Sequence, residues 1–155
     1  MVQALKLKMK EQKGFTLIEL LAVIVILGII AAIAIPAISN VINKSDNKSN
    51  VQDAILIIDA AKMYVADSQP KTAETYLTFN GIAAADGTEA KPFALKDYLD
   101  RVKDNGFIVK VTYTAPTTTT GAKYSYSISK HNAVTALGGT KTSDYKSEAD
   151  LLAAN

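Results

Sequence analysis

The chain has 155 residues, with 17 basic and 15 acidic side chains, one histidine and no cysteine. This length accommodates one ordinary domain together with a membrane segment, and a second domain is not expected. The lack of cysteine excludes disulfides and thiolate metal sites. With a single histidine and no cysteine, a zinc enzyme and a Cys-His or Ser-His nucleophile pair are also unsupported.

Positive charge is concentrated at the start of the chain. Residues 1–14 contain four lysines and one glutamate, which leaves 13 basic and 14 acidic side chains in the remainder. Basic residues beside a first apolar segment favour keeping that end in the cytoplasm. The lysines are therefore interpreted as a topology signal and not as a polyanion-binding surface, and the C-terminal part of the chain is predicted to face outward.

One acidic side chain lies near the start of a long apolar segment. As a helix, the segment from Phe15 to Ile38 would measure about 36 Å, enough to cross about 30 Å of hydrocarbon. A carboxylate costs roughly 2.5 to 3.5 kcal/mol at the membrane centre and less near the interface, so Glu19 should have a polar or charged partner. A cut between Gly14 and Phe15 would create an α-amino group one helical turn from Glu19.

Two plainer interpretations of this segment are open. An ordinary secretory signal would use Ala32-Ile33-Ala34 as its peptidase site, but its apolar core is usually only about 7 to 15 residues long. A plain single-span anchor would explain the hydrophobicity. Both leave Glu19 without a partner.

The run Lys13-Gly14-Phe15-Thr16-Leu17-Ile18-Glu19-Leu20-Leu21, followed by apolar residues to Ile35, closely resembles the N-terminus of type IV prepilins. The resemblance implies that Gly14 ends a leader peptide and that Phe15 becomes the N-methylated terminus. It also implies that Glu19 pairs with the Phe15 amine of a neighbouring subunit during assembly. Beyond the first 40 to 50 residues, the chain resembles the family only in its general plan.

The resemblance implies three parts: a leader peptide (1–14), a transmembrane and filament-core helix (15–38) and a pilin head domain (39–155). Pro36 removes a backbone donor inside the helix and should bend or locally open it. Pro36 could simply be a proline that a membrane helix tolerates. The resemblance favours a second interpretation, in which Pro36 is a hinge that helps subunits pack. The close spacing of Gly28 and Ala32 is only a weak signal for helix packing.

After the apolar segment, the pattern narrows to one helical face. The expected core positions recur at spacings of three and four and are Val51, Ala54, Ile55, Ile58, Ala61, Met63 and Val65. Together with the apolar segment they predict one helix from Phe15 to about Ser68, ended by Pro70. The asparagine-rich stretch 39–50 suggests a local loosening of this helix.

The pattern of the C-terminal half predicts a small sheet. A polar connection after Pro70 leads to a short amphipathic helix within 91–102, and strands are predicted at 107–113, 124–128 and, less clearly, 133–137, with a helical turn or tail at 147–154. The link at 117–121 predicts an antiparallel hairpin. The expected fold class is α+β: a long N-terminal helix, membrane-spanning in its first half, packed against a three- to four-stranded antiparallel sheet.

The other candidate sites are expected to have no binding or catalytic role. His131 is expected in a solvated turn. Asp144, Glu148 and Asp150 lack the spacing of a calcium loop, so no metal or cofactor is expected. Nucleic-acid binding is possible but unsupported, because the lysines are dispersed among acidic residues; those considered are Lys103, Lys110, Lys123, Lys130, Lys141 and Lys146.

By resemblance, the chain is predicted to be a structural subunit of a type IV pilus and not an enzyme. The precursor would span the cell membrane once with its N-terminus in the cytoplasm, and the assembled form would be a surface filament for adhesion, motility or DNA uptake. Implied partners are other copies of the chain, a prepilin peptidase, an assembly ATPase and a platform protein. The alternatives are a minor pilin or a pseudopilin of a secretion or competence machine and, from another class, an uncleaved membrane-anchored binding or enzyme domain.

Overall fold

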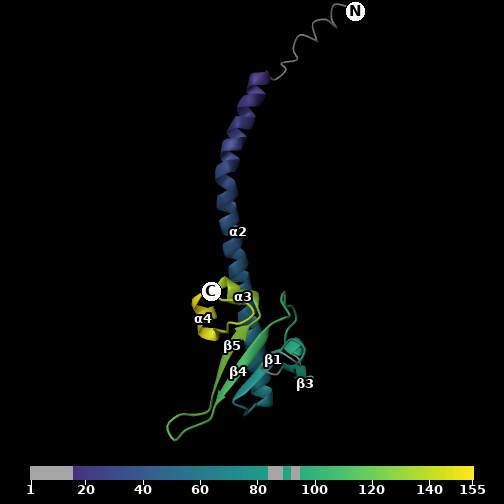
Figure 1. Ribbon diagram of the computed structural model, residues 1–155, viewed down its shortest axis with the longest axis vertical. Coiled ribbons are helices and arrows are strands. Elements are labelled where there is room, and N and C mark those ends of the chain that lie inside the picture. The colour runs from purple at the N-terminus through teal and green to yellow at the C-terminus, as the bar shows by residue number, and fades with distance from the viewer. Residues whose placement is uncertain (1–15, 84–88, 92–94) are drawn as a thin grey trace, which may run out of the picture. The chain divides into compact units, whose positions relative to one another are not determined.

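The computed structural model describes residues 16–83, 89–91 and 95–155 (Figure 1). The chain divides into two compact units, the first ending at Ile42 and the second comprising Asn43 to Asn155. Helix α2 (Leu17–Ser68) supplies the described part of the first unit and the opening segment of the second.

Helix α2 confirms the predicted long helix and its end at Ser68. The backbone leaves the helix at Gln69, whose φ of 44° lies in the left-handed region, and Pro70 follows immediately. The loosening expected at 39–50 is absent, because this stretch is helical throughout. Asparagine lowers helix propensity by well under 1 kcal/mol per residue, which is too little to interrupt a helix extended on both sides.

In the first unit, helix α2 presents its large apolar side chains to the outside. Their exposed fractions range from 50% at Val23 to 82% at Leu17. By length and composition, α2 is the one helix in the described ranges that could cross a membrane. Pro36 lies inside it, and the helix continues on both sides of the proline.

The second unit contains one antiparallel sheet in the order β3-β2-β1-β4-β5-β6, counted over the described residues. Three strands are long enough to form most of the ladder: β1 (Glu74–Thr78), β4 (Ile108–Thr114) and β5 (Lys123–Ser129). The others have two or three residues: β2 (Ile82–Ala83), β3 (Glu89–Lys91) and β6 (Lys146–Ser147). The long strands confirm the predicted antiparallel sheet, and the short strands extend it to six.

The predicted hairpin is confirmed by strands β4 and β5, which pair from Ile108 with Ser129 to Thr114 with Lys123. The residues after Pro70 are predicted as a polar connection, but they include strand β1. It occupies the centre of the sheet beside β4, and only Thr75 and Leu77 of its five residues are buried. Two buried positions in a five-residue strand are a weak periodic signal.

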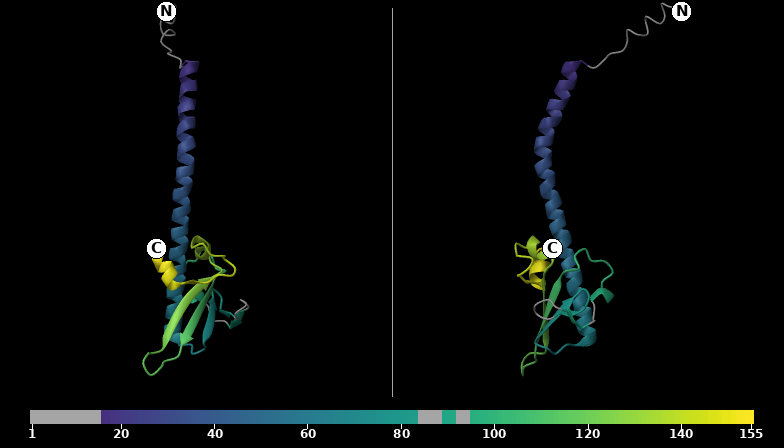
Figure 2. Two further views of the ribbon diagram at one scale, coloured as in Figure 1. Left: turned by 60° about the vertical axis from the view of Figure 1, so that its left-hand side comes forward. Right: turned by 45° about the vertical axis from the view of Figure 1, so that its right-hand side comes forward.

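The core lies between the sheet and the last turns of α2, and both views of Figure 2 show the sheet beside this part of the helix. Its members from the helix and the three long strands include Ala54, Ile57, Ile58, Ala61, Leu77, Val109, Val111 and Ile128. One stripe of the helix and one face of the sheet are buried together, which confirms the α+β fold class.

The buried stripe differs from the predicted one at several positions. Ile57, Ala60 and Tyr64 are buried, whereas Met63 is 60% exposed. Nine residues at about 100° each place Met63 on the side of the helix opposite Ala54. Helix packing on a sheet buries one continuous face, so an apolar side chain on the other side stays outside.

Two other predicted elements differ in the structure. In the described part of 91–102, Lys91 ends strand β3 and a short 3-10 helix, η1 (Leu95–Asp97), follows in place of the longer helix expected; its bonds from Tyr98 N to Leu95 O and from Leu99 N to Lys96 O span three residues. The expected strand 133–137 is helix α3 (Asn132–Ala136). The predicted C-terminal helical turn is confirmed by α4 (Glu148–Ala153), which has a capping box between Ser147 and Asp150.

Helix α3 is fixed by its two ends. The His131 side chain accepts a hydrogen bond from Ala133 N at the N-terminus. At the C-terminus, Gly138 has φ of 73°, Gly138 N donates to Thr135 O and Gly139 N donates to Val134 O. These bonds form a Schellman motif, so the two glycines end a helix and not a strand.

Candidate functional site

Glu19 is held in a reciprocal hydrogen-bond pair with Thr16, the residue before helix α2. The Glu19 carboxylate accepts from Thr16 N at 2.9 Å and from Thr16 Oγ1 at 2.8 Å, and Glu19 N donates to Thr16 Oγ1 at 3.3 Å. This arrangement is a capping box, which satisfies backbone donors at the start of the helix. The carboxylate thus has polar partners within its own chain, and the same contacts fix its direction near the start of the apolar segment.

Other predicted positions of this segment are described only in part. Gly14 and Phe15, the expected cleavage and methylation positions, lie outside the described residues. Pro36 is placed within α2. Between Glu19 and Pro36, the large apolar side chains surround the helix and are exposed. A helix that is apolar on all sides is suited to burial in lipid or among other apolar helices.

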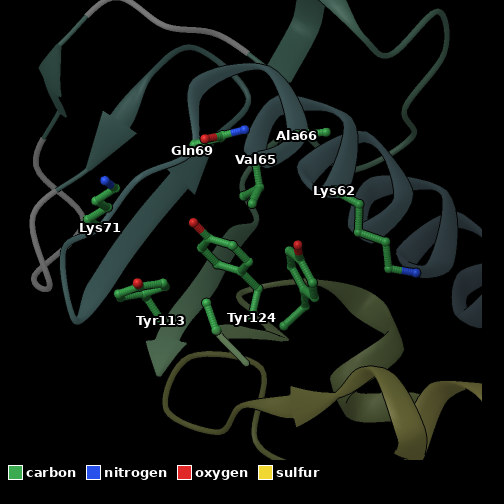
Figure 3. A pocket seen from close by; sticks show the side chains of 9 residues that line it. Lys62, Val65, Ala66, Gln69, Lys71, Tyr113 and Tyr124 are labelled. Carbon is green, nitrogen blue, oxygen red and sulfur yellow. The ribbon is translucent and has the colours of Figure 1, made fainter. Parts of the chain in front are cut away.

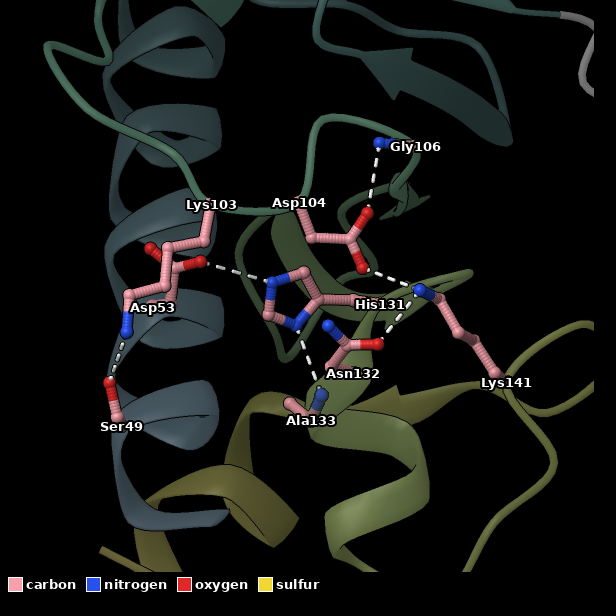
Figure 4. A network of polar contacts seen from close by, with 9 residues as sticks. All are labelled: Ser49, Asp53, Lys103, Asp104, Gly106, His131, Asn132, Ala133 and Lys141. Carbon is pink, nitrogen blue, oxygen red and sulfur yellow. Dashed lines mark hydrogen bonds and ion pairs between the residues drawn. The ribbon is translucent and has the colours of Figure 1, made fainter. Parts of the chain in front are cut away.

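His131 is fully buried, which corrects the expectation of a solvated turn residue. Its Nδ1 atom accepts from Ala133 N at 3.1 Å, so the neutral ring carries its proton on Nε2, which lies 3.3 Å from Asp53 Oδ2 (Figure 4). Burial lowers the pKa of His131 below its usual value, and the hydrogen bond with Asp53 opposes this shift only in part.

A second polar contact lies beside the histidine. Asp104 Oδ2 accepts from Lys141 Nζ at 2.7 Å, and Lys141 also donates to Asn132 Oδ1 at 2.8 Å (Figure 4). These bonds tie the segment before β4 to the residues around α3, while His131 ties α3 to α2. No sequence motif marks this network, because its members come from four separate segments. The one signal for it in the sequence is the lone histidine, which stands at a position that can cap a helix.

The three carboxylates considered for calcium have separate partners. Asp144 accepts from Thr140 N, Glu148 accepts from Lys62 Nζ, and Asp150 forms the α4 capping box. Among the described residues, no group of three His, Cys, Asp or Glu side chains is arranged to hold a metal ion.

The dispersed lysines are partly engaged with acidic residues. Lys110 Nζ lies 2.6 Å from Glu74 Oε1, and Lys141 pairs with Asp104. Ion pairing of this kind removes cations from any phosphate-binding surface.

One family model matches the N-terminal segment, and one kind of relative matches the chain well beyond it. Residues 9–35 match the family described as the prokaryotic N-terminal methylation motif. The chain is 34% identical over 112 residues to the type IV major fimbrial protein FimA of Dichelobacter nodosus, a match that covers 66% of this chain and 68% of the relative. No solved structure gives a significant match.

Relatives of a second kind match a shorter part of the chain. It is 39% identical over 61 residues to the type II secretion system core protein G of Vibrio cholerae, which covers 39% of this chain and 42% of the relative. The protein of the same name from Escherichia coli K12 is 36% identical to the chain over 58 residues, and the match covers 40% of that relative. The chain thus spans less than half the length of these secretion proteins, but two thirds of the fimbrial relative.

Proposed function

Because the chain belongs to the type IV pilin family, we propose that it is a structural subunit of a type IV pilus that polymerises through its N-terminal helix into a surface filament. The observation that carries the proposal is the start of α2, where an apolar, outward-facing segment begins with a fixed carboxylate at Glu19. Such a segment is stable in lipid before assembly and among identical helices afterwards.

Processing would change the partner of Glu19. In the proposal, a prepilin peptidase cuts between Gly14 and Phe15 and methylates the new Phe15 amine. The carboxylate of one subunit then pairs with the amine of the next, which sets the axial register between them. Within the apolar filament core an unpaired carboxylate is unfavourable, so correct register is favoured over other offsets.

In the proposal, successive parts of the chain have different roles. Residues 1–14 act as the leader, 15–38 as the membrane anchor and filament core, and 39–155 as the head domain. Pro36 provides the position at which the helix bends or unwinds as subunits pack, because it lacks the donor for one helical hydrogen bond. The precursor spans the cell membrane with its N-terminus in the cytoplasm, and an assembly ATPase and a platform protein drive its polymerisation.

A pseudopilin of a secretion or competence machine is the second candidate, supported by the likeness to core protein G. The fimbrial match extends over 112 residues and so reaches well beyond the apolar segment, whereas the secretion match extends over only 61. This difference favours the pilus. Loss of secretion with intact surface filaments, after deletion of the chain, would favour the secretion machine instead.

The first experiment is to determine the N-terminal residue and intact mass of the protein in filaments sheared from the cell surface. A chain that begins at methylated Phe15 in this fraction is expected. An intact chain found only in membranes would contradict processing and favour the uncleaved anchored domain.

A further inference from the structure

A pocket of about 420 Å³ lies between the last turns of α2 and the β4–β5 hairpin, within the second unit (Figure 3). We call it the tyrosine pocket because Tyr113, Tyr124 and Tyr126 line it from the strands. Lys62 lines it from the helix, and Gln69 and Lys71 line it from the residues just after the helix end. A pocket of this volume is at the lower end of the range for small-ligand sites.

The aromatic rings of the tyrosine pocket are held in place by packing and by one hydrogen bond. The ring centroids of Tyr113 and Tyr124 are 5.2 Å apart, and the ring planes are tilted by 44°. The Tyr124 hydroxyl donates to Pro70 O at 3.0 Å. The hydroxyls of Tyr113 and Tyr126 make no hydrogen bond to another described residue, so both are available to a ligand.

The two lysines of the pocket differ in their charge environment. Lys62 Nζ lies 2.9 Å from Asp59 Oδ1 and 2.5 Å from Glu148 Oε1, so its charge is compensated. Lys71 forms no ion pair with a described carboxylate, and no described residue that lines the pocket is acidic. Lys71 is therefore the one lining cation that is not paired with a described carboxylate, and it lies beside aromatic surface.

We propose that the tyrosine pocket binds one acidic sugar residue of an oligosaccharide. The apolar face of the sugar ring would pack on the tyrosine rings, its hydroxyls would bond the phenols and the Gln69 amide, and its carboxylate would pair with Lys71. A single-stranded nucleic acid is less suitable, because its successive phosphates require a row of uncompensated cations.

The test is a titration of the full-length chain in non-ionic detergent, followed by tyrosine fluorescence. The probes are digalacturonate, neutral digalactose and oligothymidylate. Lys71→Gln removes the proposed cation, and Tyr113→Leu removes one aromatic ring and its hydroxyl. Lys123→Gln is the matched control, because Lys123 is also exposed but does not line the pocket.

Saturable binding of digalacturonate is expected, weakened about fivefold or more by Lys71→Gln and by Tyr113→Leu and unchanged by Lys123→Gln. Digalactose should bind more weakly than digalacturonate and should not respond to Lys71→Gln. The proposal is overturned if digalacturonate does not bind, if Lys71→Gln and Lys123→Gln have equal effects, or if oligothymidylate is the tighter ligand. The titration requires no filament, so its result is independent of the proposed polymerisation.

Discussion

His131 and Asp53 lie 78 residues apart in the chain and meet in the core, with His131 Nε2 3.3 Å from Asp53 Oδ2. The other ring nitrogen accepts from Ala133 N and caps helix α3. The charged groups facing the ring are Asp53 from α2, Asp104 from the segment before β4 and Lys141 from the segment before β6. A proton added to Nδ1 would face a backbone N–H, so protonation removes the cap.

Acidification is therefore expected to destabilise the head. Burial places the folded-state pKa of His131 below the unfolded value of about 6.5, so the unfolded chain binds more protons as the pH falls below that value. The free energy of unfolding should decrease below about pH 6.5, by at most about 1.4 kcal/mol per pH unit from this group. Urea unfolding followed by tyrosine circular dichroism reports on the head alone, because all seven tyrosines lie between residues 64 and 145.

His131→Asn is the control for this pH dependence. Asparagine is a good N-cap residue and keeps an acceptor for Ala133 N, but it does not titrate. The variant should be less stable at neutral pH and should lose the decrease between pH 6.5 and 5. An equal pH dependence in both proteins would assign the effect to other groups.

The role of Glu19 can be separated into capping and charge. Both Glu19→Gln and Glu19→Ala remove the carboxylate, but glutamine retains an acceptor for the capping box with Thr16. If the ionic pair with Phe15 controls assembly, both variants should yield few surface filaments while their heads unfold at the same urea concentration as wild type. Filament yield in sheared fractions measures the first effect. Normal assembly of Glu19→Gln, together with failure of Glu19→Ala, would assign the role to capping.

Neighbouring positions on α2 offer a direct test of the packing face. Ile57 is fully buried and Leu56 is 59% exposed. Ile57→Ala should lower the free energy of unfolding by about 2 to 5 kcal/mol, because it leaves a cavity against the sheet. Leu56→Ala should change it by no more than about 0.5 kcal/mol in the detergent-solubilised chain. Similar losses in both variants would contradict the observed orientation of the helix.

The long helix and the β4–β5 hairpin were predictable because each has a strong local pattern. The apolar run and Pro70 define the helix, and alternating apolar residues around 117–121 define the hairpin. Strand β1 was not predictable in this way, since its pairing with Val109 and Val111 of β4 is a long-range contact. The same holds for His131, whose burial depends on α2 lying beside α3.

The segment that forms helix α3 is predicted incorrectly as a strand. Residues 133–137 are small, apolar or β-branched, so their composition suits a strand as well as a buried helix. The deciding signal is Gly138-Gly139, because these glycines form a Schellman motif, which ends a helix. Five residues are too few for a helical period to appear. The residues at the two ends of the segment therefore distinguish a helix from a strand here.

Gly139 lies so close to helix α3 that a side chain at this position requires a shift of its neighbours. A Cβ atom at this position would lie 2.9 Å from Val134 Cγ1 and 3.1 Å from Val134 O, and the carbonyl is fixed by its bond to Gly139 N. Gly139→Ala should therefore lower the free energy of unfolding by about 1 to 3 kcal/mol, because relief of the contact requires a shift of α3. Gly121→Ala is the control, since a Cβ atom there meets nothing within 4 Å. If both variants unfold at the same urea concentration, the close approach of Gly139 to α3 does not restrict this position.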